Sequence, residues 1–352
     1  MNEKILITGG TGYIGSHTAI SLIEQGYEVV ILDNLKNSSE DVLDRIAAIC
    51  GDRPQLVIGD VRDNDFLTTV FKAHQFDGVM HFAGAKAVGE SAEQPLLYYE
   101  NNVTGTLNLC KAMHEAQIRK LIFSSSATVY GDQNPMPLTE SSPLSPPSSP
   151  YGRSKLMCEE ILRDLYGSDN SWKIGILRYF NPIGAHSSGL IGESPIGTPN
   201  NLLPYILQVA SGKRRELSVF GDNYPTPDGT GIRDYIHIMD LAAGHIRAYE
   251  YISDNHGARS WNLGSGHGYS VLQIINEFKR ATGVNINYRI APKRDGDIAE
   301  CWAQVERAEL ELDWRPSRSL EEMLKDAWNW ERSSSVSVIK PDLISSPDLS
   351  DF

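Results

Sequence analysis

The sequence is poor in cysteine. Only Cys50, Cys110, Cys158 and Cys301 occur among its 352 residues, and no two of them stand at the spacing of metal ligands. This distribution argues against a disulfide framework and a zinc module, and it predicts four reduced thiols. We therefore expect no metal site.

Excess basic charge and long apolar runs are also missing. The chain has 32 Lys and Arg against 45 Asp and Glu, a net charge of −13 at pH 7, which argues against a broad surface for nucleic acid or anionic membrane. The first apolar run, Ile5-Leu6-Ile7, is too short for the core of a signal peptide, and no later run could span a bilayer. The sequence predicts a cytoplasmic protein without nucleic-acid or membrane partners.

Short apolar runs alternate with helical patterns over the first half of the chain. Continuous apolar strands separated by helices are typical of a parallel sheet buried on both faces. We therefore predict an α/β fold with a doubly wound parallel sheet of the Rossmann type. The expected strands are 5–7, 29–32, 56–58, 79–82, 121–123 and 174–177.

The composition of the sequence changes after about residue 180. Residues 181–205 are rich in Gly, Pro, Asn and Ser, and later strand-like and helical stretches suggest a smaller α/β domain. We expect a sheet domain over 1–180, a smaller C-terminal α/β substrate domain over 181–332 and a Ser/Pro/Asp-rich loose tail over 333–352. The chain is expected to cross between the two domains more than once, so this boundary is approximate.

A glycine-rich loop follows the first expected strand. Gly9, Gly12 and Gly15 precede a helical pattern, which is the context in which such spacing indicates a dinucleotide site. Gly9 permits a tight turn, Gly12 lets the backbone approach a pyrophosphate, and Gly15 allows the helix to pack closely on the strand. The helix N-terminus supplies N–H donors for the pyrophosphate.

Two aspartates end the next strands. Asp33 stands at the end of the second strand, where a carboxylate accepts hydrogen bonds from the adenosine ribose and repels a 2′-phosphate. No arginine follows it directly, so the sequence favours NAD over NADP. Asp60 and Val61 follow the third strand and are candidates for contacting adenine, although a turn role for Asp60 is an equal alternative.

A tyrosine and a lysine lie one helical turn apart behind a run of three serines. Tyr151 and Lys155 should project from one face of a helix, and Ser126 ends the serine run. An ammonium group near a phenol favours the phenolate, so we expect Lys155 to lower the pKa of Tyr151 toward the working pH. These three residues are the predicted catalytic group.

The order of these motifs resembles the extended short-chain dehydrogenase/reductase superfamily. Four longer stretches, 82–91, 124–131, 177–182 and 231–237, resemble the UDP-glucose 4-epimerase family. The resemblance covers roughly residues 3–331.

The resemblance implies roles for further residues. It implies a cofactor site that also includes Tyr13, Ile14, Asn34, Asn37, Phe82, Ala83, Gly84, Lys86, Asn101, Ser124 and Tyr179. It implies a sugar nucleotide held by Lys86, Phe180, Asn181, Asn201, Leu202, Arg233, Arg294 and Asp297. It also implies that Tyr151 removes the O4 proton while hydride passes from C4 to tightly bound NAD. The 4-keto sugar is then expected to rotate about its bonds to the diphosphate and to be reduced on its other face.

Cys301 departs from the family pattern. Family members restricted to hexoses typically carry tyrosine at this position, and a smaller side chain leaves room for a 2-acetamido group. We therefore expect activity on UDP-GlcNAc/UDP-GalNAc as well as on UDP-glucose/UDP-galactose. The alternative is a neutral buried cysteine with no such role.

Competing functions remain at this point. A sugar-nucleotide 4,6-dehydratase typically has an Asp-Glu pair after the catalytic Ser or Thr, where this chain has Ala127-Thr128. A simple dehydrogenase would release NADH, and a non-catalytic NAD-sensing module would not need Ser126, Tyr151 and Lys155 together. The resemblance also implies a homodimer, with helices near 100–116 and around Tyr151 as candidates for the interface.

Overall fold

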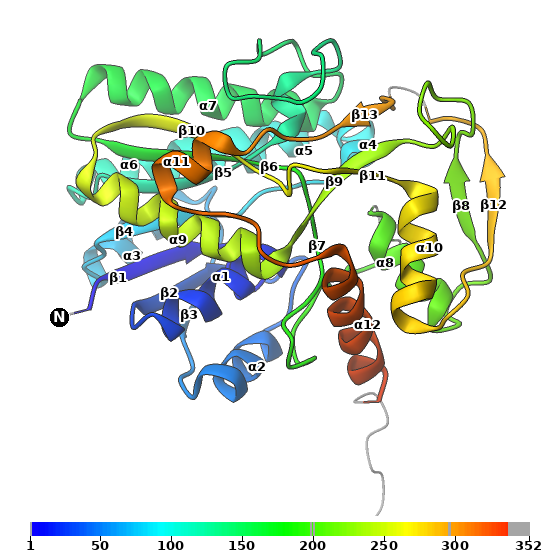
Figure 1. Ribbon diagram of the computed structural model, residues 1–352. Coiled ribbons are helices and arrows are strands. Elements are labelled where there is room, and N and C mark those ends of the chain that lie inside the picture. The colour runs from blue at the N-terminus through cyan, green and yellow to red at the C-terminus, as the bar shows by residue number, and fades with distance from the viewer. Residues whose placement is uncertain (1, 198, 200, 295–296, 337–352) are drawn as a thin grey trace, which may run out of the picture.

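A seven-stranded parallel sheet forms the larger part of the molecule (Figure 1). The computed structural model describes residues 2–197, 199, 201–294 and 297–336. The strand order is β10-β6-β5-β4-β1-β2-β3. The strands are β1 (Lys4–Thr8), β2 (Glu28–Asp33), β3 (Gln55–Ile58), β4 (Gly78–His81), β5 (Lys120–Ser126), β6 (Lys173–Tyr179) and β10 (Gly257–Leu263). The predicted doubly wound fold is confirmed.

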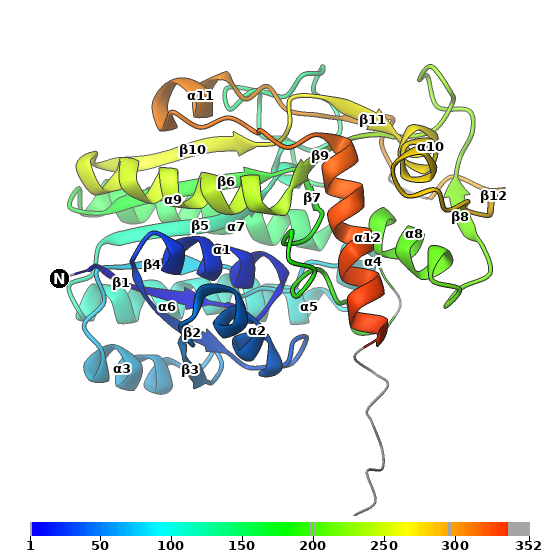
Figure 2. The same cartoon turned by 60° about the horizontal axis from the view of Figure 1, so that its bottom comes forward.

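Helices cover both faces of this sheet. One face is covered by α1 (Tyr13–Glu24), α2 (Asp41–Cys50) and α9 (Ile238–Asp254), whose apolar residues share a core with β1 and β2. The other face is covered by α3 (Asn64–Ala73), α6 (Gly105–Glu115) and α7 (Pro150–Ser168). Figure 2 shows α1 and α9 running over the strands, with α7 behind them. Two apolar cores therefore enclose the strands, as their continuous apolar sequences require.

Strand β10 was missed by the sequence analysis. Its sequence, Gly-Ala-Arg-Ser-Trp-Asn-Leu, has no continuous apolar run, and it occupies an edge of the sheet beside β6. Both α9 and β10 lie C-terminal to the approximate boundary at residue 181, yet they belong to the large sheet. The chain therefore returns to the first domain after entering the second.

The smaller domain has its own apolar core, lying mainly between two small sheets and three helices. One sheet contains β7 (Asn181–Ile183), β9 (Ile232–His237), β11 (Gly268–Ser270) and β13 (Glu300–Cys301), and the other pairs β8 (Leu217–Phe220) with β12 (Tyr288–Ala291). The helices are α8 (Leu202–Ala210), α10 (Val271–Thr282) and α12 (Leu320–Val336). Shorter helical segments complete the described chain: α4 (Val88–Glu93), α5 (Pro95–Tyr98), η1 (Tyr99–Thr104), η2 (Ala127–Tyr130) and α11 (Glu306–Leu312).

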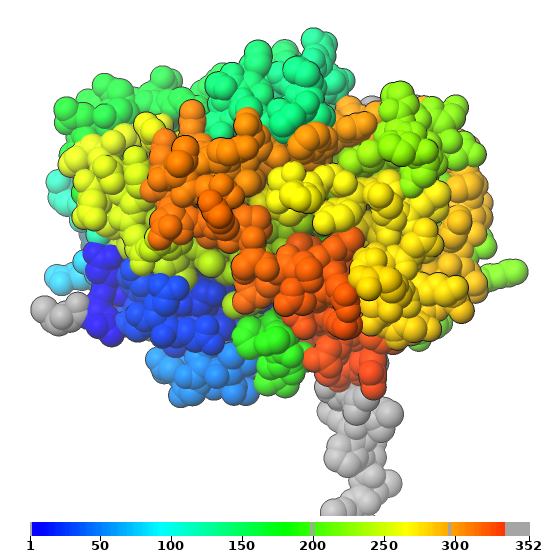
Figure 3. All heavy atoms as spheres, in the orientation of Figure 1, coloured from blue at the N-terminus to red at the C-terminus, as the bar shows by residue number. Residues whose placement is uncertain are grey.

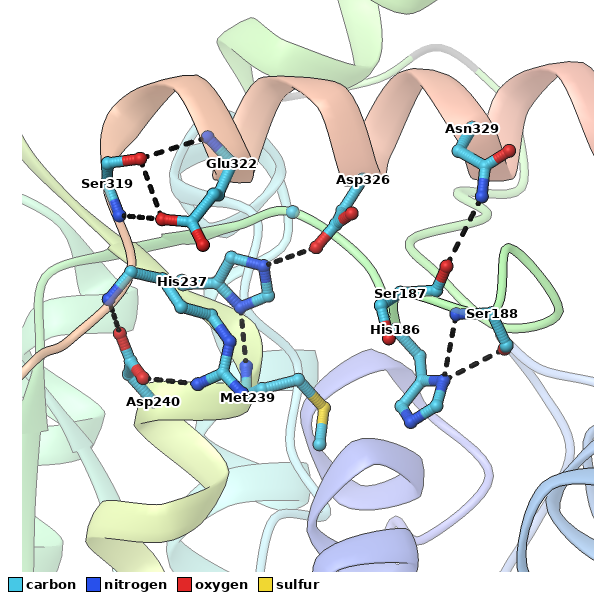
Figure 4. Close-up of polar contacts among 12 residues, drawn as sticks. His186, Ser187, Ser188, His237, Met239, Asp240, Ser319, Glu322, Asp326 and Asn329 are labelled. Carbon is cyan, nitrogen blue, oxygen red and sulfur yellow. Dashed lines mark hydrogen bonds and ion pairs between the residues drawn. The ribbon is translucent and has the colours of Figure 1, made fainter.

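Helix α12 crosses the junction between the domains. In Figure 3 its side chains fill the surface beside α10. Asp240 at the start of α9 accepts hydrogen bonds from the backbone of Ser317 and Arg318, and Asp326 lies 3.2 Å from the buried His237 ring (Figure 4). The helix reaches Val336, four residues into the expected tail, and the rest of that tail lies outside the described residues.

Among the described residues, none of the helices combines the length and the apolar character needed to cross a bilayer.

Candidate active site

The glycine loop joins β1 to α1 and touches the end of β4. Gly9 has φ +71°, and a Cβ there would stand 2.7 Å from the backbone nitrogen of Ala83. A Cβ on Gly15 would stand 2.4 Å from the carbonyl oxygen of Gly9, whereas one on Gly12 would meet only that oxygen, at 3.3 Å. Gly9 and Gly15 are therefore required for packing, and Gly12 leaves open space at the N-terminus of α1, which fits a pyrophosphate.

Asp33 organises the loops around this turn. Its carboxylate accepts hydrogen bonds from the backbone N–H of Thr11 (3.1 Å) and of Leu35 (2.9 Å), and from the Ser38 hydroxyl (3.3 Å). The carboxylate is thus fixed at the carboxyl end of β2, beside the glycine loop, where sequence analysis expected a ribose partner.

An arginine that the sequence analysis did not consider lies near this end of the site. Arg62 forms a bidentate pair with Asp60, whose other donor is the Asn34 amide at 2.9 Å. The hydrogen bond from Arg62 is the main reason that the pKa of Asp60 lies well below its usual range. The positive charge of Arg62 is therefore balanced by Asp60, which disfavours Arg62 as a partner for a 2′-phosphate. A spacing rule based on Asp33 could not find it, because it follows a different strand.

Helix α7 carries Tyr151 and Lys155. Ser149 accepts a hydrogen bond from the Gly152 backbone at 3.1 Å, and Pro150 occupies the first helical turn, so the helix begins just before Tyr151. The Lys155 amine is buried, donates to the Ser124 carbonyl at 2.6 Å and lies 5.0 Å from the centre of the Phe123 ring. Both residues thus face the end of β5, as the four-residue spacing predicts.

Ser126 lies at the end of β5 and caps the short helix η2. Its oxygen accepts hydrogen bonds from the backbone and the hydroxyl of Thr128, the latter at 3.0 Å. Ser126 lies near enough to the Tyr151 hydroxyl to lower the pKa of the phenol. The three predicted catalytic residues therefore meet in one place.

Burial, Ser126 and Lys86 also act on the Tyr151 phenol, and the expected effect of Lys155 stays a prediction. Burial raises the pKa of Tyr151 above its ordinary value, and the neighbouring Ser126 and the charge of Lys86 oppose that rise. Burial lowers the pKa of Lys155 to about 8, and its ammonium points at the Ser124 carbonyl. Lys86 is thus a second cation that acts on the phenol, and a one-turn spacing argument could not identify it.

Lys86 and Asn201 both contact the carboxylate of Glu193, which the sequence analysis did not identify. Lys86 lies 3.0 Å from Glu193 and Asn201 donates to the same oxygen at 3.3 Å, so the two domains are joined here. Leu202 begins α8 directly after Asn201.

Tyr179 and Phe180 follow one another at the carboxyl end of β6. The Tyr179 hydroxyl makes a short hydrogen bond to His245 of α9, and Phe82 lies 4.8 Å from the His245 ring centre. Phe180 packs in an apolar cluster that Cys301 also touches. Burial raises the pKa of the Cys301 thiol to about 11, so the thiol is neutral.

Three residues predicted to hold the nucleotide form one ion cluster. Asp297 binds Arg233 at 2.5 Å and Arg294 at 3.1 Å. Asn181 donates to the Asp234 carbonyl at 3.1 Å, on β9 next to Arg233. Two arginines sharing one carboxylate leave unmatched positive charge for a diphosphate.

Asn102 is a second residue that the sequence analysis missed. It lies in the π-helix η1. Its side-chain amide accepts a hydrogen bond from the Ala85 backbone N–H at 2.8 Å and donates to the Ala85 carbonyl at 3.0 Å. It also donates to the Ser154 hydroxyl of α7 at 2.8 Å. The predicted Asn101 side chain instead donates to the Leu97 carbonyl of its own helical segment. A π-helix next to a catalytic helix is a frequent feature of functional sites, but a sequence does not reveal it.

Some predicted cofactor residues have side chains committed elsewhere. The Tyr13 hydroxyl donates to the Gly184 carbonyl at 2.8 Å, and Val61 is buried in the apolar core. A Cβ on Gly84 would stand 3.7 Å from the Lys155 amine, which places Gly84 inside the site. Ile14 packs against the core and Asn37 is exposed. In the described chain, His, Cys, Asp and Glu form no group suited to a metal ion.

Comparisons with known proteins identify relatives over almost the whole chain. The family model described as GDP-mannose 4,6 dehydratase matches residues 6–327. The UDP-glucose 4-epimerase of Yersinia pestis is 56% identical over 327 residues, which cover 93% of this chain and 97% of that protein.

Solved structures agree as well. The UDP-glucose-4-epimerase of Stenotrophomonas maltophila, with bound NAD and formylated UDP-arabinopyranose, has a TM-score of 0.93 at 47% identity and covers 96% of this chain and 100% of its own. The enzyme of Bifidobacterium longum, in complex with NAD+ and UDP, has a TM-score of 0.92 at 48% identity, covering 94% and 99%. The dehydratase model spans the shared fold, but the carboxylate pair expected of a dehydratase is absent after Ser126. By its sequence, its fold and the residues gathered around Tyr151, the chain belongs to the UDP-glucose 4-epimerase family.

Proposed function

We propose that this protein inverts C4 of UDP-glucose and UDP-galactose with a tightly bound NAD, through a transient 4-keto sugar. The observation that carries the proposal is the convergence of Ser126, Tyr151 and Lys155 at the carboxyl end of β5, beside the glycine loop. Ligands of doubly wound sheets bind at this end of the strands.

The residues around the glycine loop fit NAD. The space above Gly12, the donors at the start of α1 and the fixed carboxylate of Asp33 match a pyrophosphate and an adenosine ribose. When bound, NAD supplies a reversible acceptor for the hydride of the sugar C4. Tyr179 is held by His245 on the same side of the site and would border the nicotinamide.

Tyr151 acts as the base on the sugar O4 hydroxyl. The proton passes to its phenolate oxygen, and Ser126 donates a hydrogen bond to the sugar oxygen. Lys86 keeps the phenolate accessible, because its positive charge opposes the effect of burial on the Tyr151 pKa. Lys155 would hold the nicotinamide ribose from the Ser124 side.

The nucleotide is gripped firmly and the sugar loosely. Arg233 and Arg294 bind the diphosphate, and Asp297 fixes both guanidinium groups and reaches a ribose hydroxyl. The sugar then turns about the diphosphate bonds and presents its other face, while binding energy from the nucleotide retains the intermediate.

The direct test is incubation of purified protein with UDP-glucose, without added cofactor, followed by separation of the sugar nucleotides. UDP-galactose should form, and no free NADH should accumulate. Stoichiometric release of NADH would instead indicate a simple dehydrogenase. A product that has lost water would indicate a dehydratase, and substrate-free NAD binding without conversion would indicate a non-catalytic module.

We further propose that the sugar pocket admits 2-acetamido sugars. Cys301 is neutral, packs beside Phe180 and is smaller than a tyrosine by most of an aromatic ring. UDP-GlcNAc should be converted by the parent protein and not by Cys301→Tyr, whereas both should convert UDP-glucose. No conversion of UDP-GlcNAc by the parent would disprove this extension.

A homodimer through α6 and α7 is also proposed. Leu107, Cys110, Ile161 and Leu165 line an apolar groove between these helices, and Lys111 and Asp164 border it. Two copies related by a twofold axis would bury this groove and bring opposite charges together. Sedimentation should give a dimer for the parent protein and a monomer for Ile161→Asp; a monomeric parent would refute the dimer.

A further inference from the structure

A fully buried ion pair lies directly behind the proposed catalytic residues. Arg178 of β6 is 1% exposed and Glu159 of α7 is 0% exposed. The guanidinium donates to both carboxylate oxygens, at 3.0 and 2.7 Å. Neither residue faces the site described above, so the proposed reaction leaves the pair without a role.

The pair connects all the elements that carry catalytic side chains. Ser125 of β5 donates to Glu159 at 2.5 Å, and Tyr130 of η2 accepts from Arg178 at 2.9 Å. Arg178 also lies 4.8 Å from the Tyr130 ring centre, and Tyr130 donates to Asn262 of β10 at 2.6 Å. One charged pair thus joins β5, η2, α7, β6 and β10.

Each member of this network is a near neighbour of a site residue. Ser125 stands between Ser124, which accepts from Lys155, and Ser126. Glu159 follows Lys155 by one helical turn, and Arg178 precedes Tyr179. In the β5–β6 register, Ser125 pairs with Arg178 and Ser126 with Tyr179.

Stability alone does not explain such a pair. Burying two charges is costly, and replacing a buried ion pair by apolar residues of similar volume often leaves stability unchanged or higher. A bidentate pair nevertheless fixes distance and angle more tightly than apolar packing does. The network therefore suits a requirement for position, since a displacement of about 1 Å at a reacting group can cost roughly a hundredfold in rate.

We propose that Glu159 and Arg178 are positioning residues, which set Ser126, Tyr151 and Lys155 in reacting geometry by locking β5 and β6 to α7. This inference rests on the proposed epimerase reaction. Glu159 has an additional electrostatic effect, because its charge raises the pKa of Lys155 against the lowering effect of burial. Further titratable neighbours of Lys155 are Tyr151 and Cys158 on its own helix and His81 on β4.

The experiment compares the parent with the double variant Glu159→Met/Arg178→Met. The two apolar side chains should restore packing without charge, so the melting temperature should stay near that of the parent. We expect kcat for UDP-glucose to fall roughly ten- to a hundredfold, with KM and bound NAD nearly unchanged. The alkaline limb of the kcat profile should move roughly one unit to lower pH, because Lys155 loses its anionic neighbour.

Two single variants keep the test decisive if the double variant does not fold. Ser125→Ala removes one hydrogen bond to Glu159 and should lower kcat severalfold at unchanged KM. Arg163→Gln is the matched control, because Arg163 binds the same carboxylate at 2.8 Å from a partly exposed position; its kcat should equal that of the parent.

The outcomes separate the two proposals. A folded double variant, or Ser125→Ala, with the kcat and pH profile of the parent would overturn the positioning role while leaving the reaction intact. If the parent itself does not interconvert the UDP-hexoses, the proposed function fails, and the positioning proposal fails with it.

Discussion

At the scale of single residues, Tyr151 is the group on which the proposed chemistry depends. Burial raises its pKa, and Ser126 and Lys86 both oppose that rise. Tyr151→Phe should lower turnover by roughly a hundredfold or more, because the base is lost, while UDP binds as before. Kinetics and calorimetric titration with UDP measure both. Tyr166→Phe, on the same helix, is the control, and parental turnover in the Tyr151 variant would exclude the assignment.

Lys86 gives a pH-dependent prediction. The reaction requires the phenolate, and the charge of Lys86 lowers the Tyr151 pKa. Lys86→Met should therefore raise that pKa, and the acid limb of the kcat profile should move to higher pH, so that activity is lost first on the acid side. Lys72→Met, on distant α3, should not move it. An acid limb that is unchanged in Lys86→Met would show that another cation controls the phenol.

At the scale of elements, different glycines of the glycine loop are expected to serve packing and NAD binding. Gly9→Ala forces a side chain into a positive φ and against Ala83, so it should destabilise the fold by about 1–3 kcal/mol or more. Gly12→Ala meets only the Gly9 carbonyl and should leave stability almost unchanged, while NAD affinity falls. Urea unfolding and NAD titration of the two variants distinguish these effects. Equal losses of stability would contradict the distinction.

Sequence periodicity identified most elements of the large sheet but not all. Strands β1, β2 and β4 have continuous apolar centres because they are buried on both faces, so short windows were sufficient to find them. Strand β10 lies at an edge and carries Arg259 and Ser260, so it lacks that signal. The π-helix η1 depends on local hydrogen bonding that no residue pattern encodes.

At the scale of the whole molecule, three of the buried histidines predict sensitivity to acid. Burial lowers the pKa of His17 and of His245 to about 4 and that of His81 to about 3, from 6.5. Between pH 6.5 and 4 the unfolded chain binds protons that the folded chain does not. Each histidine therefore contributes stability that is complete above pH 6.5 and is lost as pH falls toward its folded pKa, at up to about 1.4 kcal/mol per pH unit.

Urea unfolding at a series of pH values measures this loss. The free energy of unfolding should fall between pH 6.5 and 4, and His17→Gln should reduce the slope by roughly one proton. A free energy of unfolding that does not change over this range would contradict the burial of these rings as neutral groups.

The amino-acid sequence by itself determined the sheet, the glycine loop and the Tyr151–Lys155 pair, because these depend on short-range spacing along one strand or one helical turn. Only the tertiary structure decided that Lys86 acts on the buried Tyr151 phenol, that Arg62 is paired with Asp60, and that Glu159 and Arg178 meet behind the site. The physical reason is that charges and hydrogen-bonding groups act through space, and these partners come from strands, helices and loops that only the folded chain brings together.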